Sequence, residues 1–102
     1  MLIGNLKKFT IDSYHKKQAR KLGVNINYSS NPDKKLDIFK DGKKVASIGA
    51  SGYNDYILYK KAEAKGIYPK GYAEKRRRLY KIRHRKNNIK GTAGYYAYNI
   101  LW

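Results

Sequence analysis

The side chains best placed to do chemistry are the arginines of residues 72–86, which read YAEKRRRLYKIRHRK. Five of the chain's six arginines lie in this segment, and its acidic content is the single Glu74. The whole chain carries 24 Lys plus Arg against 7 Asp plus Glu, a net charge of +17 over 102 residues. Clustered like charge destabilises a folded protein unless an anion compensates it. We therefore expect the chain to contact a polyanion or an acidic protein surface.

The arginine-rich segment is predicted to form a helix that begins after Gly71. At 100° per residue, one side of this helix is the predicted core face and collects Tyr72, Ala73, Leu79 and Tyr80. Arg76 and Arg83 fall in the same sector. We expect these two structural arginines to stack on tyrosines and to pair with scarce carboxylates such as Asp55 or Asp37. The opposite side is predicted to bind the anionic partner and carries Arg77, Arg78, Lys81, His84 and Arg85.

A second basic helix is predicted over residues 13–22, SYHKKQARKL. Asp12 and Ser13 are its candidate N-caps, and Gly23 is the expected stop. Its core face is expected to hold Tyr14, Ala19 and Leu22. Its exposed face is the second predicted partner-binding surface and carries Lys16, Lys17, Arg20 and Lys21.

Aromatic rings are abundant, with 11 tyrosines, two phenylalanines and one tryptophan. Most tyrosines are expected to build the core, because Leu, Ile and Phe are few. The alternative, in which some rings stack on unpaired bases, stays open. Three rings crowd the C-terminal end and are the candidates for an aromatic protein interface: Tyr95, Tyr96 and Trp102.

The clearest local signal is a β-hairpin predicted over residues 35–48. Two short apolar runs are joined there by Asp41-Gly42, the pair that best supplies the positive φ angles of a type I′ turn. A two-residue loop would place Ile38 opposite Val45. The predicted faces are then Leu36, Ile38 and Val45 on one side, and Phe39 and Ile48 on the other.

The remaining pattern completes an α+β fold. Alternating apolar residues from Val24 to Tyr28 predict a third strand. A helix is expected over residues 56–65 after an N-cap at Asn54 or Asp55, and a last short helix is expected after Thr92. We predict one compact basic domain over residues 1–102, with a small three-stranded antiparallel sheet covered by two to four helices.

Several classes of site are not indicated. Cysteine is absent, and His15 and His84 are the only histidines, so no metal site is expected. A Walker loop, paired catalytic carboxylates and a nucleophile with its base are missing, and residues 66–68 match only the opening of a nuclease GIY motif. We therefore expect no enzyme, cofactor or small-molecule substrate. No segment reaches the length of a membrane span, and residues 1–12 do not read as a secretion signal, so a soluble protein inside a cell or a particle is expected.

Three blocks of the chain carry a family resemblance. In order, they read KKLDIFKDGKKVASIGASGYNDY, YAEKRRRLYKIRH and GTAGYYAYNILW. They resemble a family of small, basic, uncharacterised proteins encoded by large double-stranded DNA viruses of algae and amoebae. The resemblance implies a viral setting, in the virion and, during assembly, in the host cytoplasm or virus factory. It implies no activity.

Two functional hypotheses follow. The first is a structural virion protein, a minor capsid or cement component that binds larger capsid proteins or other acidic protein surfaces through its basic faces and aromatic C-terminal segment. The second is a sequence-nonspecific protein that binds double-stranded DNA and neutralises the viral genome. We prefer the first hypothesis.

Overall fold

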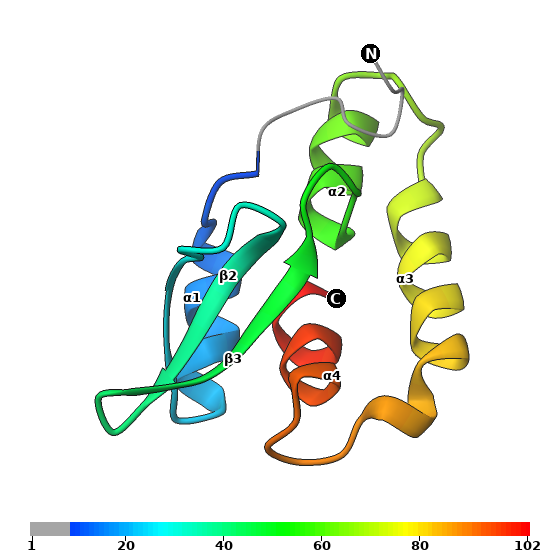
Figure 1. Cartoon of the computed structure of the whole chain (residues 1–102). Helices are drawn as coiled ribbons and strands as arrows, with labels where there is room; N and C mark the ends of the chain where they lie inside the picture. Colours follow the sequence, from blue (N-terminus) through cyan, green and yellow to red (C-terminus); the bar gives the residue numbers. More distant parts are fainter. Residues whose placement is uncertain (1–8) are drawn as a thin grey trace.

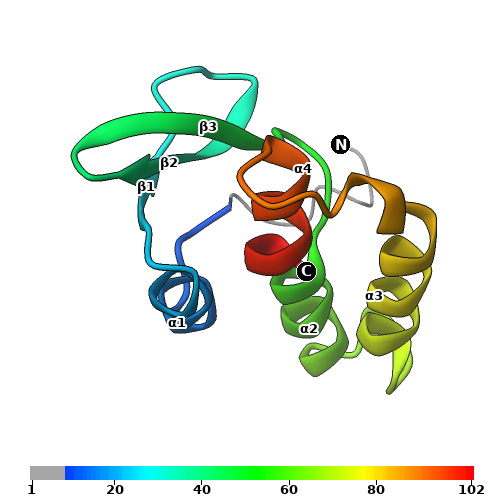
Figure 2. The ribbon, with the colours of Figure 1, turned by 90° about the horizontal axis from the view of Figure 1, so that it is seen from below.

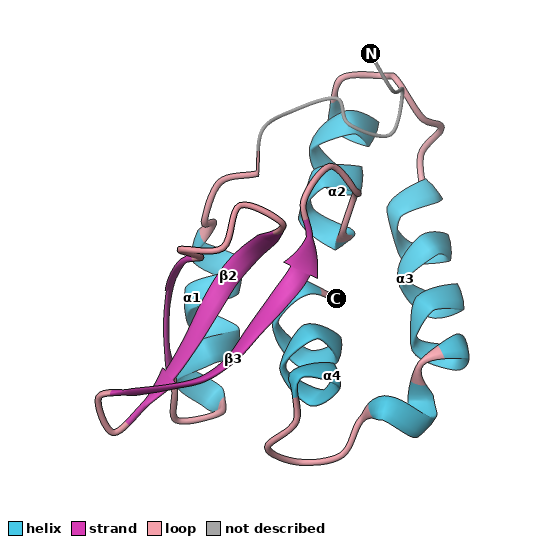
Figure 3. Ribbon diagram, viewed as in Figure 1, coloured by secondary structure: helices cyan, strands magenta, loops and turns pink. Residues whose placement is uncertain are grey.

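The computed structural model describes residues 9–102, so the first eight residues of the predicted domain lie outside the described part. The fold is α+β, as predicted, with an open three-stranded antiparallel sheet in the order β1-β2-β3 (Figure 1, Figure 3). The elements in chain order are α1 (Ser13–Lys21), β1 (Asn25–Tyr28), β2 (Lys34–Lys40), β3 (Lys43–Ala50), α2 (Tyr56–Ala64), α3 (Tyr72–Arg83), η1 (Arg85–Asn87), α4 (Ala93–Tyr96) and η2 (Ala97–Leu101).

The helices form one side of the molecule and the sheet the other. Seen from below, α1 and α4 lie on the same face of the sheet, and α2 and α3 lie beyond α4 (Figure 2). The segment that runs through α4 and η2 is therefore central. It packs against α1 through the amide of Gln18, which donates to the carbonyl of Asn99 at 2.9 Å, and through the hydroxyl of Tyr14, which donates to the carbonyl of Trp102 at 3.2 Å.

The predicted hairpin turn is confirmed, because Asp41 and Gly42 adopt φ angles of 53° and 80°. The predicted pairing of Ile38 with Val45 is wrong. Ile38 lies opposite Ala46 and Phe39 lies opposite Lys44, so Val45 is an extra residue in a β-bulge. A one-residue insertion moves the following side chains to the other face of the strand.

The bulge decides which side chains enter the core. Ile48 pairs with Leu36 and therefore shares the face of Leu36 and Ile38, instead of the face of Phe39. All three are at most 2% exposed, whereas Val45 is 43% exposed. The core thus gains a larger isoleucine in place of the expected valine. Ile100 and Leu101 of η2 complete it from the helical side.

Helices α2 and α3 pack against each other and are tied at their ends. Asp55 is the N-cap of α2 and accepts the N–H of Leu58 at 3.2 Å, which confirms one of the two predicted caps. Near the start of α3, the carboxylate of Glu63 accepts the N–H of Ala73 at 2.9 Å. A backbone donor at a helix N-terminus is satisfied in this way by a side chain from the neighbouring helix.

Candidate anion-binding surfaces

The first basic surface, which we name the α1 face, consists of four exposed side chains: Lys16, Lys17, Arg20 and Lys21. The structure places all four where the sequence predicted them. The opposite side of α1 buries His15 and Ala19. The helix begins at a capping box, in which the Asp12 carboxylate accepts the N–H of Tyr14 and the Asp12 N–H donates to Nδ1 of His15, both at 2.9 Å.

His15 was not among the residues predicted for the core. Its side chain is fully buried, and burial lowers its pKa below the ordinary value of 6.5. The ring is therefore neutral near pH 7, and it adds no charge to the α1 face. The pattern that could have identified it is a histidine three residues after the N-cap, where a capping box normally has Glu or Gln.

The scarce carboxylates bind groups of the fold itself. Five of the seven form hydrogen bonds or ion pairs within the chain: Asp12, Asp37, Asp55, Glu63 and Glu74. Among the described residues, no ion pair joins a cation of the α1 face to a carboxylate. The charge of this face must therefore be compensated by water, salt or a partner.

Helix α3 is rotated relative to the predicted wheel, so three of its predicted outward residues lie half-buried. The guanidinium of Arg77 lies 4.7 Å from the ring centre of Tyr56 and 3.8 Å from the carboxylate of Glu74. The ammonium of Lys81 lies 4.6 Å from the ring centre of Tyr98, and burial lowers the pKa of Lys81 below its usual 10.5.

His84 is the third of these residues, and its ring stacks on Tyr80 with centroids 4.2 Å apart. Arg77 and Lys81 therefore help to hold α3 against α2 and η2, whereas His84 packs on α3 itself, and all three are less exposed than the predicted binding face requires. The predicted core face held Tyr72, Ala73, Leu79 and Tyr80, with Arg76 and Arg83 in the same sector. The real centre lies at Ala73, which is fully buried, and at Tyr80, whose ring stacks on Trp102 with centroids 4.4 Å apart and planes 7° apart.

The two predicted structural arginines have different fates. Arg76 is half-buried and its guanidinium lies 5.6 Å from the ring centre of Tyr59, so the predicted stacking on tyrosine is confirmed. Its predicted pairing with Asp55 or Asp37 is wrong, because those carboxylates bind Lys35 in one case, and serines and Lys44 in the other. Arg83 is exposed, because the rotation of α3 turns it away from the core.

The outward side of this region is the second basic surface, which we name the α3 face. Arg78 and Arg85 lie on it as predicted, and it also includes three cations outside the predicted binding set: Lys75, Arg83 and Lys86. An isoleucine, Ile82, lies one helical turn after Arg78 and is 59% exposed. No signal in the sequence separated Lys75 and Lys86 from the other cations, because their exposure depends on the rotation of α3.

The predicted aromatic interface is wrong for two of its three members. Tyr96 is 5% and Trp102 is 9% exposed, and both belong to the core of the chain itself. Tyr95 is half-buried and packs edge-on against Tyr96 with centroids 5.3 Å apart. The C-terminal rings bind the sheet and α3 because the core contains too few aliphatic side chains to close without them.

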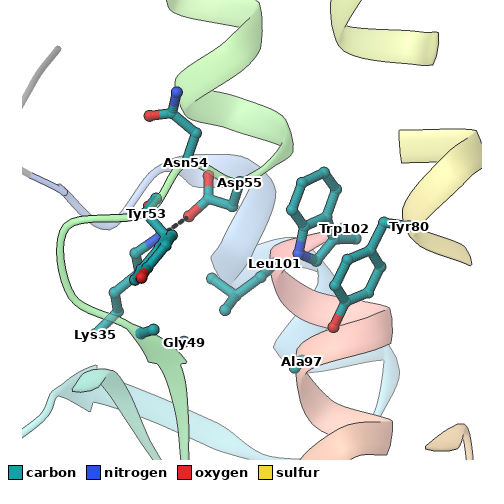
Figure 4. A pocket seen from close by; sticks show the side chains of 10 residues that line it. Lys35, Gly49, Tyr53, Asn54, Asp55, Tyr80, Ala97, Leu101 and Trp102 are labelled. Atoms are coloured by element: carbon teal, nitrogen blue, oxygen red, sulfur yellow. Dashed lines mark hydrogen bonds and ion pairs between the residues drawn. The ribbon is translucent and has the colours of Figure 1, made fainter. Parts of the chain in front are cut away.

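A buried ion pair that the sequence did not predict lies beside a cavity of about 260 Å³ (Figure 4). Nζ of Lys35 lies 3.0 Å from Oδ2 of Asp55 and donates to the carbonyl of Tyr53 at 2.5 Å. Leu101 lies between this pair and the stacked rings of Tyr80 and Trp102 (Figure 4). Lysine and aspartate satisfy each other here, so the arrangement is that of a structural ion pair.

The two basic surfaces lie on opposite flanks of the molecule. Helices α1 and α3 are separated by α4 and α2, as the view from below shows (Figure 2). Both helices bury residues on one side, His15 and Ala19 in α1 and Ala73 in α3, and carry their exposed cations elsewhere on the helix. A single flat partner cannot cover both surfaces at once.

Residues 9–102 contain neither a metal-binding cluster nor a membrane-spanning helix. No three His, Cys, Asp or Glu side chains in this range lie close enough together to hold a metal ion. No helix in this range is both long and apolar enough to cross a membrane. Comparison with protein-family models, with curated proteins and with solved structures found no match to the chain.

Proposed function

We propose that this protein is a non-enzymatic structural component that joins two acidic partners, one through the α1 face and one through the α3 face. The observation that supports the proposal is that these two basic surfaces lie on helices at opposite flanks of one small fold and form no ion pair with a carboxylate within residues 9–102. A minor capsid or cement role in a virion, binding larger capsid proteins, is the form of this function that fits the viral resemblance of the sequence.

An acidic protein surface fits these faces better than a nucleic acid does. Ile82 is 59% exposed within the α3 face, and Ile89, after η1, is 62% exposed. Exposed aliphatic side chains among cations are typical of protein contacts, where apolar and charged groups are buried together. Phosphate groups offer no apolar surface to such side chains.

The test uses two populations of beads, both coated with polyglutamate and labelled with different dyes. The wild-type protein is expected to join the two populations into mixed clusters. Reversal of one face to Glu should leave a protein that binds beads but no longer joins them. The α1-face variant changes Lys16, Lys17, Arg20 and Lys21, and the α3-face variant changes Lys75, Arg78, Arg85 and Lys86.

A matched control reverses four exposed lysines outside both faces: Lys34, Lys40, Lys43 and Lys60. It has the same net charge as the two face variants, so a general loss of charge affects all three equally. Clustering should survive in the control. If either face variant joins the beads as well as the control does, the two-surface proposal is wrong.

Duplex DNA is the second candidate partner, and the α1 face favours it. Four cations on a nine-residue helix that contains no acidic residue also suit a row of phosphates. Affinity for random duplex should then fall by orders of magnitude between roughly 50 and 200 mM salt. Tight binding to duplex together with failure to join polyglutamate beads would favour DNA over an acidic protein.

A further inference from the structure

A cavity of about 320 Å³ lies between α1 and the edge of the sheet. Its apolar lining comes from Ile11, Ala19, Val24 and Ile26, and its polar lining from Asn25 and two cations of the α1 face, Lys16 and Arg20. Strand β1 is the outer strand of the sheet on this side. An apolar groove with a cationic rim therefore runs beside a strand edge.

Within residues 9–102, no hydrogen bond from outside the sheet reaches the backbone N–H or C=O of Ile26. The N–H of Ser29 donates to the carbonyl of Lys35 at 3.1 Å, which makes this pair a hydrogen-bonded one. In an antiparallel ladder such pairs alternate, so Asn25 and Asn27 also face β2, and the N–H and C=O of Ile26 point away from it. The next outward N–H, that of Tyr28, is already bound to the side-chain oxygen of Asn27 at 2.8 Å.

We propose that this groove binds an extended acidic segment of a partner protein, which pairs with the open backbone of Ile26 as a short added strand. Side chains two residues apart in such a segment share a face, so an aliphatic side chain would fill the groove and a carboxylate two residues away would reach Lys16 and Arg20. This inference rests on the proposed function and names the chemistry of the α1-face partner.

A second copy of the chain does not fit the same edge. Pairing of two β1 strands would bring the Lys16 and Arg20 side chains of both copies together, and like charges at an interface are repulsive. A phosphate backbone does not fit either, because it has no aliphatic group for the walls of the groove. Charge complementarity thus selects an acidic, apolar peptide.

The probe is an eight-residue peptide, acetyl-(Glu-Thr-Val-Thr)₂-amide, called the Glu-Val peptide, in which glutamate and valine share one face; it is titrated into the ¹⁵N-labelled protein. The backbone amide of Ile26 should shift downfield and exchange more slowly with solvent, because it gains a hydrogen bond. The control peptide acetyl-(Glu-Thr-Ser-Thr)₂-amide, called the Glu-Ser peptide, carries the same charge without the valines, and it should bind at least tenfold more weakly. Equal binding of the two peptides, or an unperturbed Ile26 amide, would overturn the inference.

Two charge variants on the same helix separate the groove from the α1 face as a whole. Lys16→Glu with Arg20→Glu changes the rim, and Lys17→Glu with Lys21→Glu makes the same change in charge outside the cavity lining. The first pair should weaken the Glu-Val peptide roughly tenfold more than the second. Equal effects would mean that only bulk charge acts, which overturns the groove.

The failure of this inference and the failure of the proposed function are distinguishable. If the beads are joined but the Glu-Val peptide binds no better than the Glu-Ser peptide, the two-surface function stands and the groove is excluded. If neither the beads nor the peptides bind, both proposals fail. Analytical ultracentrifugation of the free protein adds a third readout. If the protein forms a dimer, and the double variant Lys16→Glu with Arg20→Glu forms it more strongly, a second copy of the chain is the occupant of the groove.

Discussion

The buried Lys35–Asp55 pair is the sharpest test of how this fold handles its charge. The side chains are 4% and 1% exposed, with Nζ 3.0 Å from Oδ2. Asp55→Asn keeps the shape of the side chain and retains an oxygen that can accept the N–H of Leu58, so the N-cap of α2 is preserved. The change removes the carboxylate charge and leaves a buried ammonium without its counter-ion.

The expected loss of unfolding free energy for Asp55→Asn is about 3 kcal/mol. This value lies at the lower end of the range for a broken buried pair, because Lys35 keeps its hydrogen bond to the carbonyl of Tyr53 and lies 5.5 Å from the ring centre of Phe9. Lys35→Met is expected to cost a similar amount, since it leaves the Asp55 carboxylate uncompensated. The double variant should lose clearly less than the sum, with a coupling of about 2 kcal/mol.

Urea unfolding measures all three variants, with the fluorescence of Trp102 as a core reporter. A matched control is Lys44→Met, which breaks the 3.7 Å pair with Asp37 on the side where the lysine is 47% exposed. It should cost less than about 1 kcal/mol. If Asp55→Asn costs no more than this control, or if the two single effects simply add, the buried pair does not act as a unit and the reasoning is refuted.

Three further predictions follow from the same core. Gly49→Ala should lower the unfolding free energy measured in urea by about 2 to 4 kcal/mol, because φ is +79° and a Cβ would lie 2.8 Å from Cδ1 of Leu101. The control Gly52→Ala has a similar φ of +86° but no neighbouring atom, so it should show only the backbone cost of about 1 kcal/mol. Hydrogen bonds from Ser47 and Ser29 lower the pKa of Asp37 from 3.8 to about 2, so the stability that its carboxylate contributes is present above pH 3.8 and is lost as the pH falls toward 2. Asp37→Asn should remove on the order of 1 to 2 kcal/mol of unfolding free energy. In this variant the melting temperature should depend less on pH between 3.8 and 2. Burial lowers the pKa of His15 below 6.5, so below that pH the unfolded chain takes up a proton that the folded chain does not. The unfolding free energy should therefore fall as the pH drops below 6.5. If His15→Gln leaves the slope of the urea midpoint against pH unchanged, this prediction is wrong.

Local chemistry predicted the parts of the fold that depend on neighbouring residues. The positive φ of Asp41 and Gly42, the caps at Asp12 and Asp55, and the cap of α4 at Thr92 all need only a short stretch of chain. The exposed side of α1 was predictable for the same reason. This short helix has one apolar stripe, and only one rotation of the helix about its axis turns that stripe toward the core.

The errors arise where long-range packing decides between two close alternatives. On α3 the apolar stripe is weak, and the charged groups of Arg76, Arg77 and Lys81 lie over tyrosine rings on the side that faces the fold. The rotation of α3 is set by the stacking of Tyr80 on Trp102, two residues 22 positions apart in the sequence. The bulge at Val45 is a similar case. Either Val45 or Ile48 could have faced the core, and the larger side chain fills it better.

The placement of the carboxylates links the stability of this fold to its proposed function. Asp12 and Asp55 cap helices, Asp55 also neutralises a buried lysine, and Asp37 binds two serine hydroxyls inside the sheet. Each of these roles needs a carboxylate at one particular position. With only seven acids in the chain, few remain for the surface. Because these acidic residues are used inside the fold, few are left to neutralise the cations of α1 and α3. A partner protein with surface carboxylates would neutralise these cations in the assembly, as Asp55 neutralises Lys35 within the fold.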